Sequence, residues 1–173
     1  GYDVTLHEEG YRLQIGAGGV DISASTVAGV HYALQTVRQL LPAEIYSRGL
    51  VERDWVLPAL LIEDHPRFGW RGLHMDVGRH FMPVEFIKKY IDLLAIHKMN
   101  RFHWHLTEDQ GWRIEIKRYP RLTTVGSVRA QTVVGHPLFQ DEDEKAFDGI
   151  AHGGFYSQEQ IKEVVAYAAA RHV

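Results

Sequence analysis

The stretch NRFHWHLTEDQGWRIEI, residues 100–116, decides how this chain is interpreted. Its first part, Arg101–Leu106, is typical of a buried strand. Two acids, Glu108 and Asp109, follow at once, with Gly111 and Trp112 just beyond them. A strand that only builds a core has no need of carboxylates at its end. This ending therefore indicates chemistry rather than packing.

An earlier strand, Gly72–Val77, precedes this stretch, and a helix from Pro83 to about His97 connects the two. Strand, helix and strand in this order are typical of a parallel sheet. The carboxyl ends of parallel strands share one edge of the sheet, where functional sites gather. Because Arg79 follows the first strand and Glu108 the second, we expect a guanidinium and a carboxylate to meet there.

The side-chain types at this edge allow three interpretations. Arg79 presents a rigid fork of donors that suits paired hydroxyls or a carboxylate, but Arg79 and Glu108 are also compatible with an ion pair that only fixes the loops. His103 and His105 share one face of their strand, as the paired ligands of metal-dependent barrel hydrolases do. Two histidines are too few for a metal site, so we expect no metal.

The N-terminal region predicts the end of a small α+β domain. Residues 11–24 alternate around a Gly-rich turn and predict a hairpin. Ser25 or Thr26 then caps a helix that Pro42 ends. The apolar face expected for this helix consists of Val27, Val30, Ala33, Leu34, Val37, Leu40 and Leu41. A short extended run follows Pro58, and we place the domain boundary after residue 65.

Beyond Leu106 the sequence predicts a long polar loop and a final helix capped by Ser157. The apolar side expected for that helix includes Ile161, Val164, Val165 and Ala168. Overall, 45% of the 173 residues are hydrophobic and the net charge is −3, which gives no reason to expect nucleic acid or a membrane as a partner. The absence of cysteine excludes disulfides and thiolate zinc sites.

Three blocks of sequence together resemble the β-N-acetylhexosaminidases of glycoside hydrolase family 20. They are WRGLHMDVGRHFMP (70–83), NRFHWHLTEDQGWRIEIKRYPRLTTVGS (100–127) and HGGFYSQEQIKEVVAYAAARHV (152–173). The resemblance implies an α/β fold, namely the N-terminal part of a (β/α)8 TIM barrel (residues 66–173) preceded by the end of a small α+β domain (residues 1–65). It also implies a secreted, periplasmic or lysosomal location.

The resemblance further implies hydrolysis of terminal N-acetylglucosamine or N-acetylgalactosamine from β-linked glycans, with retention of configuration. In that mechanism the 2-acetamido oxygen of the sugar is the nucleophile, so no cofactor is implied. Arg79 matches the arginine that holds hydroxyls of the terminal sugar. Glu108 matches an acid that supports the catalytic acid, and Asp109 is its neighbour.

The chain departs from the family pattern in one decisive respect. The catalytic Asp-Glu pair of the family follows Gly-Gly, whereas here Gly153-Gly154 precedes Phe155 and the pairs within Asp141–Glu144 lie in a charged loop. We therefore expect a fragment that lacks the catalytic pair, is inactive alone and self-associates. A metal-dependent hydrolase using His103 and His105, and a non-catalytic carbohydrate-binding protein, are the two alternatives.

Overall fold

The computed structural model describes residues 1–135, 141 and 145–173 of the chain. Contacts divide the chain into two compact units. Unit 1 comprises Gly1–Arg71, Leu93–Arg101 and Arg171–Val173, and unit 2 comprises Gly72–Asp92 and Phe102–Ala170. Most of the acidic cluster considered above, residues 142–144, lies outside the described residues. Each unit is described separately.

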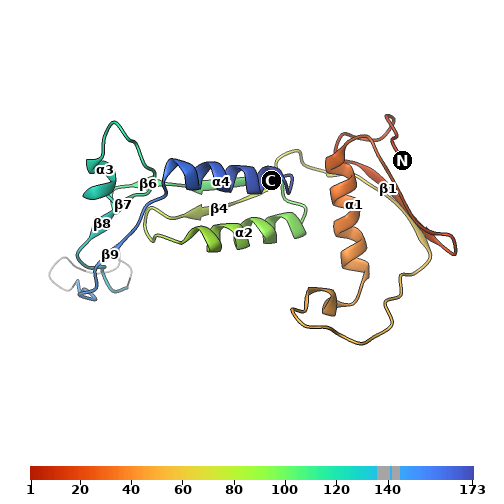
Figure 1. Ribbon diagram of the computed structural model, residues 1–173, viewed down its shortest axis with the longest axis horizontal. Helices are drawn as coiled ribbons and strands as arrows, with labels where there is room; N and C mark the ends of the chain where they lie inside the picture. The colour runs from red at the N-terminus through yellow and green to blue at the C-terminus, as the bar shows by residue number, and fades with distance from the viewer. Residues whose placement is uncertain (136–140, 142–144) are drawn as a thin grey trace. The chain divides into compact units, whose positions relative to one another are not determined.

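Unit 1 contains a three-stranded sheet in the order β2-β1-β3 (Figure 1). The central strand β1 (Tyr11–Gly16) forms the predicted antiparallel hairpin with β2 (Gly19–Ala24). Gly19 has a φ of 123° in the turn, which side chains rarely permit. The extended run after Pro58 becomes β3 (Leu60–Asp64), which pairs antiparallel with the other side of β1.

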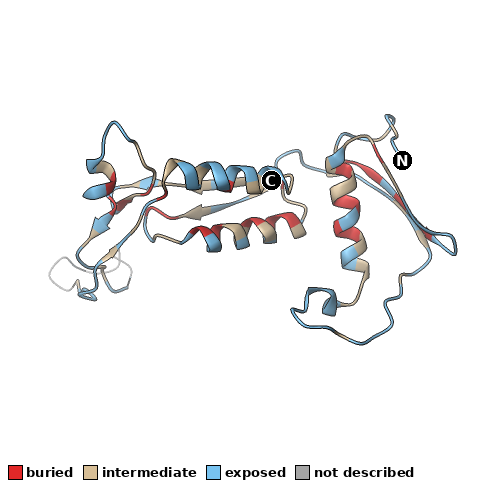
Figure 2. Cartoon of the chain, in the orientation of Figure 1, coloured by how far each residue is buried: buried red, intermediate tan, exposed pale blue. Residues whose placement is uncertain are grey.

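Helix α1 (Val27–Leu40) packs on this sheet, and Thr26 is the residue that caps it. The predicted apolar face is wrong at two positions, because Val27 and Leu34 are exposed. Figure 2 shows that α1 carries both buried and exposed positions along its length. Ala33 is buried as predicted, and Tyr32 and Thr36 are buried although they were not part of the predicted face. The buried stripe includes polar side chains that find partners within the unit, and hydrophobicity alone does not detect such positions. The apolar core consists of Tyr11, Leu13, Ile15, Ala24, Tyr32 and Ala33.

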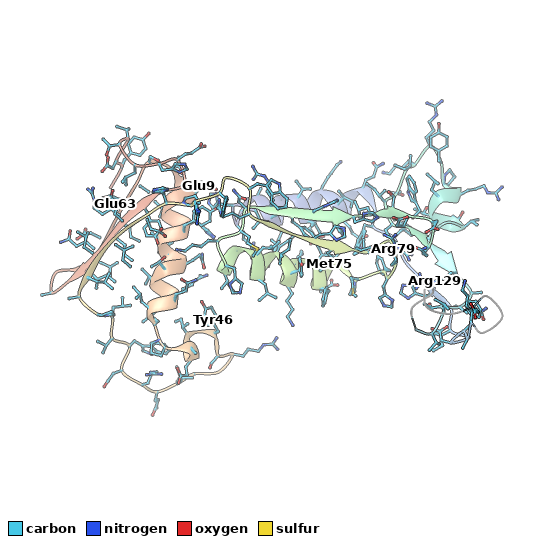
Figure 3. All side chains as sticks on the ribbon, turned by 180° about the vertical axis from the view of Figure 1, so that it is seen from behind. Glu9, Tyr46, Glu63, Met75, Arg79 and Arg129 are labelled. Carbon is cyan, nitrogen blue, oxygen red and sulfur yellow. The ribbon has the colours of Figure 1, made fainter. Side chains whose placement is uncertain are left out.

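A polar network in unit 1 centres on the Glu9 carboxylate, labelled in Figure 3. This carboxylate accepts hydrogen bonds from Arg71 Nη1 at 2.9 Å, Asn100 Nδ2 at 3.0 Å and Tyr32 Oη at 3.1 Å. Burial, followed by the charge of Glu9, raises the pKa of Tyr32 to about 12. The network explains why the segments around Arg71 and Asn100 belong to unit 1.

The β/α/β unit that the sequence predicts is present, and it belongs to unit 2 except for residues 93–96 of its helix and Arg101, which fall in unit 1. β4 (Gly72–Asp76) and β5 (Arg101–His105) form a two-stranded sheet, and α2 (Val84–Ile96) connects them. His74 lies beside His103, and the Val77 amide donates to the His105 carbonyl at 3.1 Å, so the two strands run in the same direction. Their carboxyl ends therefore lie at one edge, as expected.

Helix α4 (Gln158–Ala169) runs alongside α2 in unit 2 (Figure 1). Lys88 of α2 bonds to Glu163 of α4, and the Tyr167 hydroxyl donates to Asp92 at 2.9 Å. Ser157 caps α4 as predicted, in a capping box with Gln160. Of the expected apolar side, Val164 is buried but Val165 is exposed. The buried hydrophobic residues of unit 2 are Val77, Val84, Ile87, Ile91, Tyr156 and Val164.

The predicted polar loop between β5 and α4 contains short elements. β6 (Thr107–Glu108) pairs with β7 (Gly111–Trp112), α3 spans Arg121–Thr124, and β8 (Val128–Arg129) pairs with β9 (His152–Gly153). Strands of two residues carry too little pattern to be predicted. The described residues thus form a mixed α/β structure and not a complete barrel. None of the helices in the described ranges is long and apolar enough to cross a membrane.

Candidate functional site

The carboxyl ends of β4 and β5 bring together one guanidinium and two carboxylates. Arg79 Nη1 lies 2.8 Å from Asp76 Oδ2 and 2.9 Å from Glu108 Oε1. The predicted meeting of Arg79 and Glu108 is therefore present in the structure, and Figure 3 labels Arg79. Sequence reasoning missed Asp76, although its position as the last residue of β4 was a usable signal.

Both acids contact the same nitrogen of Arg79. Within the described residues, Nε and Nη2 of Arg79 have no hydrogen-bond partner, and 52% of the side chain is exposed. The hydrogen bond to Asp76 raises the pKa of Arg79, and the charges of Glu108 and Asp109 add to this effect. The site thus presents a cation that two acids hold and that remains half exposed.

Asp76 and Arg79 stabilise each other's charged form. Partial burial opposes ionisation of Asp76, but the backbone amide and the side chain of Arg79 donate hydrogen bonds to the carboxylate and lower its pKa below the usual value. Asp76 is therefore ionised throughout the neutral range and anchors Arg79 at the end of β4.

Glu108 connects Arg79 to a histidine of β5. Its Oε1 atom lies 3.4 Å from Nε2 of His105, and its Oε2 atom accepts the backbone amide of Asp109 at 3.2 Å. Asp109 itself occupies the turn between β6 and β7. Of the two predicted acids, Glu108 thus makes the direct contacts, and Asp109 contributes its charge.

Arg113 is a buried guanidinium that sequence reasoning missed. It donates to four main-chain carbonyls, those of Val77 (2.9 Å), Gly78 (3.0 Å), Ser127 (2.5 Å) and Gly154 (3.0 Å). Burial, and then the charge of Arg129, lower the pKa of Arg113. Because Gly78 directly precedes Arg79, Arg113 fixes the backbone that carries the candidate site.

Two further residues hold the loop that follows β4. Arg129 of β8, labelled in Figure 3, donates from Nη1 to the carbonyl of Arg79 at 2.8 Å. His152 of β9 accepts the Phe81 amide at Nε2 at 2.9 Å and stacks on the ring of His80. His152 is partly buried and anchors the loop through this bond.

The tryptophans of the opening stretch lie in different surroundings. Trp104 packs edge-on against Tyr156, with ring centroids 4.6 Å apart. Trp112 is partly buried and donates from Nε1 to the Ile114 carbonyl at 2.6 Å. Burial raises the pKa of Tyr156 to about 12. The Trp104 ring thus forms part of the packing of unit 2.

The strands also bring a third histidine to the pair noted in the sequence. His74 of β4 lies with its ring centroid 4.7 Å from that of His103 and 5.5 Å from that of His105. Sequence reasoning missed His74 because the alignment of β4 with β5 is not visible in the sequence.

The chain resembles curated beta-hexosaminidases over almost its whole length. It is 48% identical over 168 residues to the Porphyromonas gingivalis beta-hexosaminidase, covering 97% of this chain and 20% of that protein. It is 42% identical over 167 residues to the Vibrio furnissii beta-hexosaminidase, covering 96% of this chain and 25% of that protein. The chain thus spans about a fifth to a quarter of the length of these relatives.

Solved structures agree with these matches. The Vibrio harveyi family 20 exo-β-N-acetylglucosaminidase, solved in complex with N-acetylglucosamine, aligns with a TM-score of 0.82 and 36% identity, covering all of this chain and 25% of that one. The Bacteroides fragilis β-N-acetylhexosaminidase aligns with a TM-score of 0.76 and 42% identity, covering 99% of this chain and 30% of that one.

The family models match both parts of the sequence. Residues 1–65 match domain 2 of glycosyl hydrolase family 20, and residues 68–173 match the catalytic domain of that family. The resemblance carried by the three sequence blocks is confirmed, and this chain belongs to glycosyl hydrolase family 20.

Proposed function

We propose that this chain is part of an exo-β-N-acetylhexosaminidase that removes terminal N-acetylglucosamine or N-acetylgalactosamine from β-linked glycans. Residues 66–173 form the first two β/α units of its barrel, and residues 1–65 form the end of the small α+β domain before it. The observation that carries this proposal is the position of Arg79, whose guanidinium is held by Asp76 and Glu108 at the carboxyl edge of parallel strands.

In this proposal Arg79 holds hydroxyls of the terminal sugar. The two acids occupy Nη1, and the donors on Nε and Nη2 have no partner among the described residues. Two donors in a rigid plane match a pair of adjacent ring hydroxyls. The raised pKa keeps the guanidinium charged at every working pH.

Glu108 and Asp109 support the site rather than react. Glu108 contacts both Arg79 and His105, so it keeps the guanidinium in one orientation. The charge of Asp109 adds to the negative field around Arg79. The catalytic Asp-Glu pair is supplied by sequence that these 173 residues do not contain, and the substrate's own acetamido group is the nucleophile.

A chimera tests this function directly. This chain replaces the matching segment of the Porphyromonas gingivalis beta-hexosaminidase, to which it is 48% identical over 168 residues. The chimera is expected to hydrolyse a chromogenic N-acetyl-β-glucosaminide, whereas the 173-residue chain alone is not. A correctly folded chimera without turnover contradicts the proposed function.

The role of Arg79 is tested in the same chimera with Arg79→Met. Two hydrogen bonds from a charged group contribute about 1.5–3 kcal/mol each, so kcat/KM is expected to fall about 100-fold or more. The matched control is Arg118→Met, because Arg118 is exposed and lies 5.9 Å from the Tyr119 ring. Equal activity in the two variants contradicts a sugar-holding role for Arg79.

A further inference from the structure

Three imidazoles from neighbouring strands converge on one face of the β4-β5 sheet. His103 and His105 are two residues apart on β5 and therefore point to the same side, and His74 comes from β4. Each ring offers one nitrogen, and these three nitrogens all lie within 4.8 Å of one another. Within the described residues no other group of histidines and acids meets this criterion.

We propose that His74, His103 and His105 bind a divalent transition metal ion, with Zn²⁺ the best fit. Three neutral imidazoles with a fourth position open to water form a known zinc ligand set. In a tetrahedral zinc site the ligand nitrogens are about 3.4 Å apart, given zinc–nitrogen bonds of about 2.1 Å. His74 and His103 are exposed, so rotation of their side chains brings the nitrogens to this spacing.

The surroundings of His105 provide a second, independent observation. Its Nε2 atom is buried and has no hydrogen-bond partner among the described residues. That atom lies 3.4 Å from Glu108 Oε1. Metal-bound histidines commonly donate their other ring N–H to a carboxylate, which orients the ring and strengthens the ligand. Glu108 is placed to accept the proton on Nε2 when Nδ1 of His105 is the nitrogen that binds the metal.

The donor set also limits which cation is bound. Imidazole nitrogen suits Zn²⁺, Co²⁺, Ni²⁺ and Cu²⁺, whereas Mg²⁺ and Ca²⁺ require oxygen ligands. Asp76, the carboxylate at the end of β4, is already held by Arg79. The site does not depend on the proposed hydrolase activity, because its ligands all lie within β4 and β5.

The test uses the 173-residue chain without a polyhistidine tag, titrated with Co²⁺ and followed by visible absorption. We expect saturable binding of one Co²⁺ per chain, displacement by Zn²⁺ and no displacement by excess Mg²⁺. Loss of one ligand in His74→Ala or His103→Ala is expected to weaken binding by about 100-fold or more, because even loss of an outer partner costs about 10–100-fold.

The matched control is His97→Ala, which removes an exposed histidine outside the cluster and is expected to leave binding unchanged. Circular dichroism of each variant verifies that the fold is retained, and Glu108→Gln, which keeps all three ligands, is expected to weaken binding about 10–100-fold. Absence of saturable Co²⁺ binding, or binding that is equal in His103→Ala and His97→Ala, overturns the proposal.

Discussion

The buried guanidinium of Arg113 donates from Nη2 to the carbonyl of Gly78 at 3.0 Å, directly before Arg79 in the chain. One arginine therefore positions another through the main chain. Arg113 bonds to carbonyls just after β4, between α3 and β8, and after β9. Arg79, which is exposed, keeps Nε and Nη2 without a partner among the described residues.

Replacing Arg113 is expected to destabilise unit 2 strongly. Arg113→Met removes the donor of the Val77, Gly78 and Gly154 carbonyls, while the Ser127 carbonyl still accepts the Gly154 amide at 3.2 Å. An unsatisfied buried group costs about 1–3 kcal/mol. We expect the free energy of unfolding to fall by about 3 kcal/mol or more, measured by urea denaturation at low protein concentration. The exposed control Arg118→Met is expected to change it by less than about 0.5 kcal/mol. We call the set of bonds from Arg113 to the four carbonyls the Arg113 clamp. A similarly small change for Arg113→Met contradicts its stabilising role.

Gly154→Ala is expected to disturb the same region. Gly154 has a φ of 149°, and an added Cβ atom lies 2.4 Å from Cδ1 of Phe81. Strain and this clash together are expected to lower the free energy of unfolding by about 1–3 kcal/mol. Gly49→Ala is the control, because its Cβ atom meets no heavy atom within 4 Å. If the clash is responsible, Phe81→Ala recovers part of the loss in a double-mutant cycle, and strictly additive effects exclude it.

Stability is expected to fall in mild acid through His152. Burial, and then the charge of His80, lower the pKa of His152 below 6.5, and its neutral Nε2 atom accepts the Phe81 amide. The unfolded state thus binds a proton more readily than the folded state. The contribution of neutral His152 to the free energy of unfolding is therefore fully present above pH 6.5 and is lost as the pH falls through the folded-state pKa.

The variant His152→Gln isolates this effect, because its amide oxygen accepts the same hydrogen bond without titrating. We expect its stability to depend less on pH between 7 and 5 than that of the unchanged chain, measured by urea denaturation at each pH. His31, whose pKa is lowered mainly by burial, contributes equally to both proteins and cancels. Identical pH profiles for the two proteins exclude His152 as the source.

The isolated chain is expected to self-associate. In the described residues β4 and β5 pair only with each other, so each leaves one edge unpaired. Leu73 on β4 and Val165 on α4 are exposed apolar side chains in the same unit. Sedimentation velocity is expected to show species that grow with concentration, and less so for Leu73→Lys. A monodisperse monomer that melts cooperatively contradicts this expectation.

Sequence reasoning succeeded where a repeating pattern or a topological rule applies. The hairpin, the β/α/β unit and the Ser157 cap follow from periodicity and capping chemistry. The contact between Arg79 and Glu108 follows because parallel strands end at the same edge. None of these inferences requires knowledge of how individual side chains are oriented.

The features that sequence reasoning missed depend on strand register and on hydrogen bonds to the main chain. Neither produces a repeating pattern of residues in the sequence. His74 joins the other two histidines only because β4 and β5 align in one register. Arg113 bonds to carbonyls, so no complementary acid in the sequence reveals its partners. Hydrophobicity alone also misassigns the face of α1. It selects Val27 and Leu34, which are exposed, and it omits Thr36, which is buried.

Every amino acid carries a carbonyl oxygen, so the Arg113 clamp is indifferent to the identity of the side chains it holds in place. Saturation mutagenesis is therefore expected to give an asymmetric tolerance map. A substitution at position 113 removes the donor of all four carbonyls at once, whereas a substitution at Ser127 keeps its carbonyl and loses only the side-chain bond to Thr123. One side chain thereby holds three backbone segments together without bonding to any of their side chains.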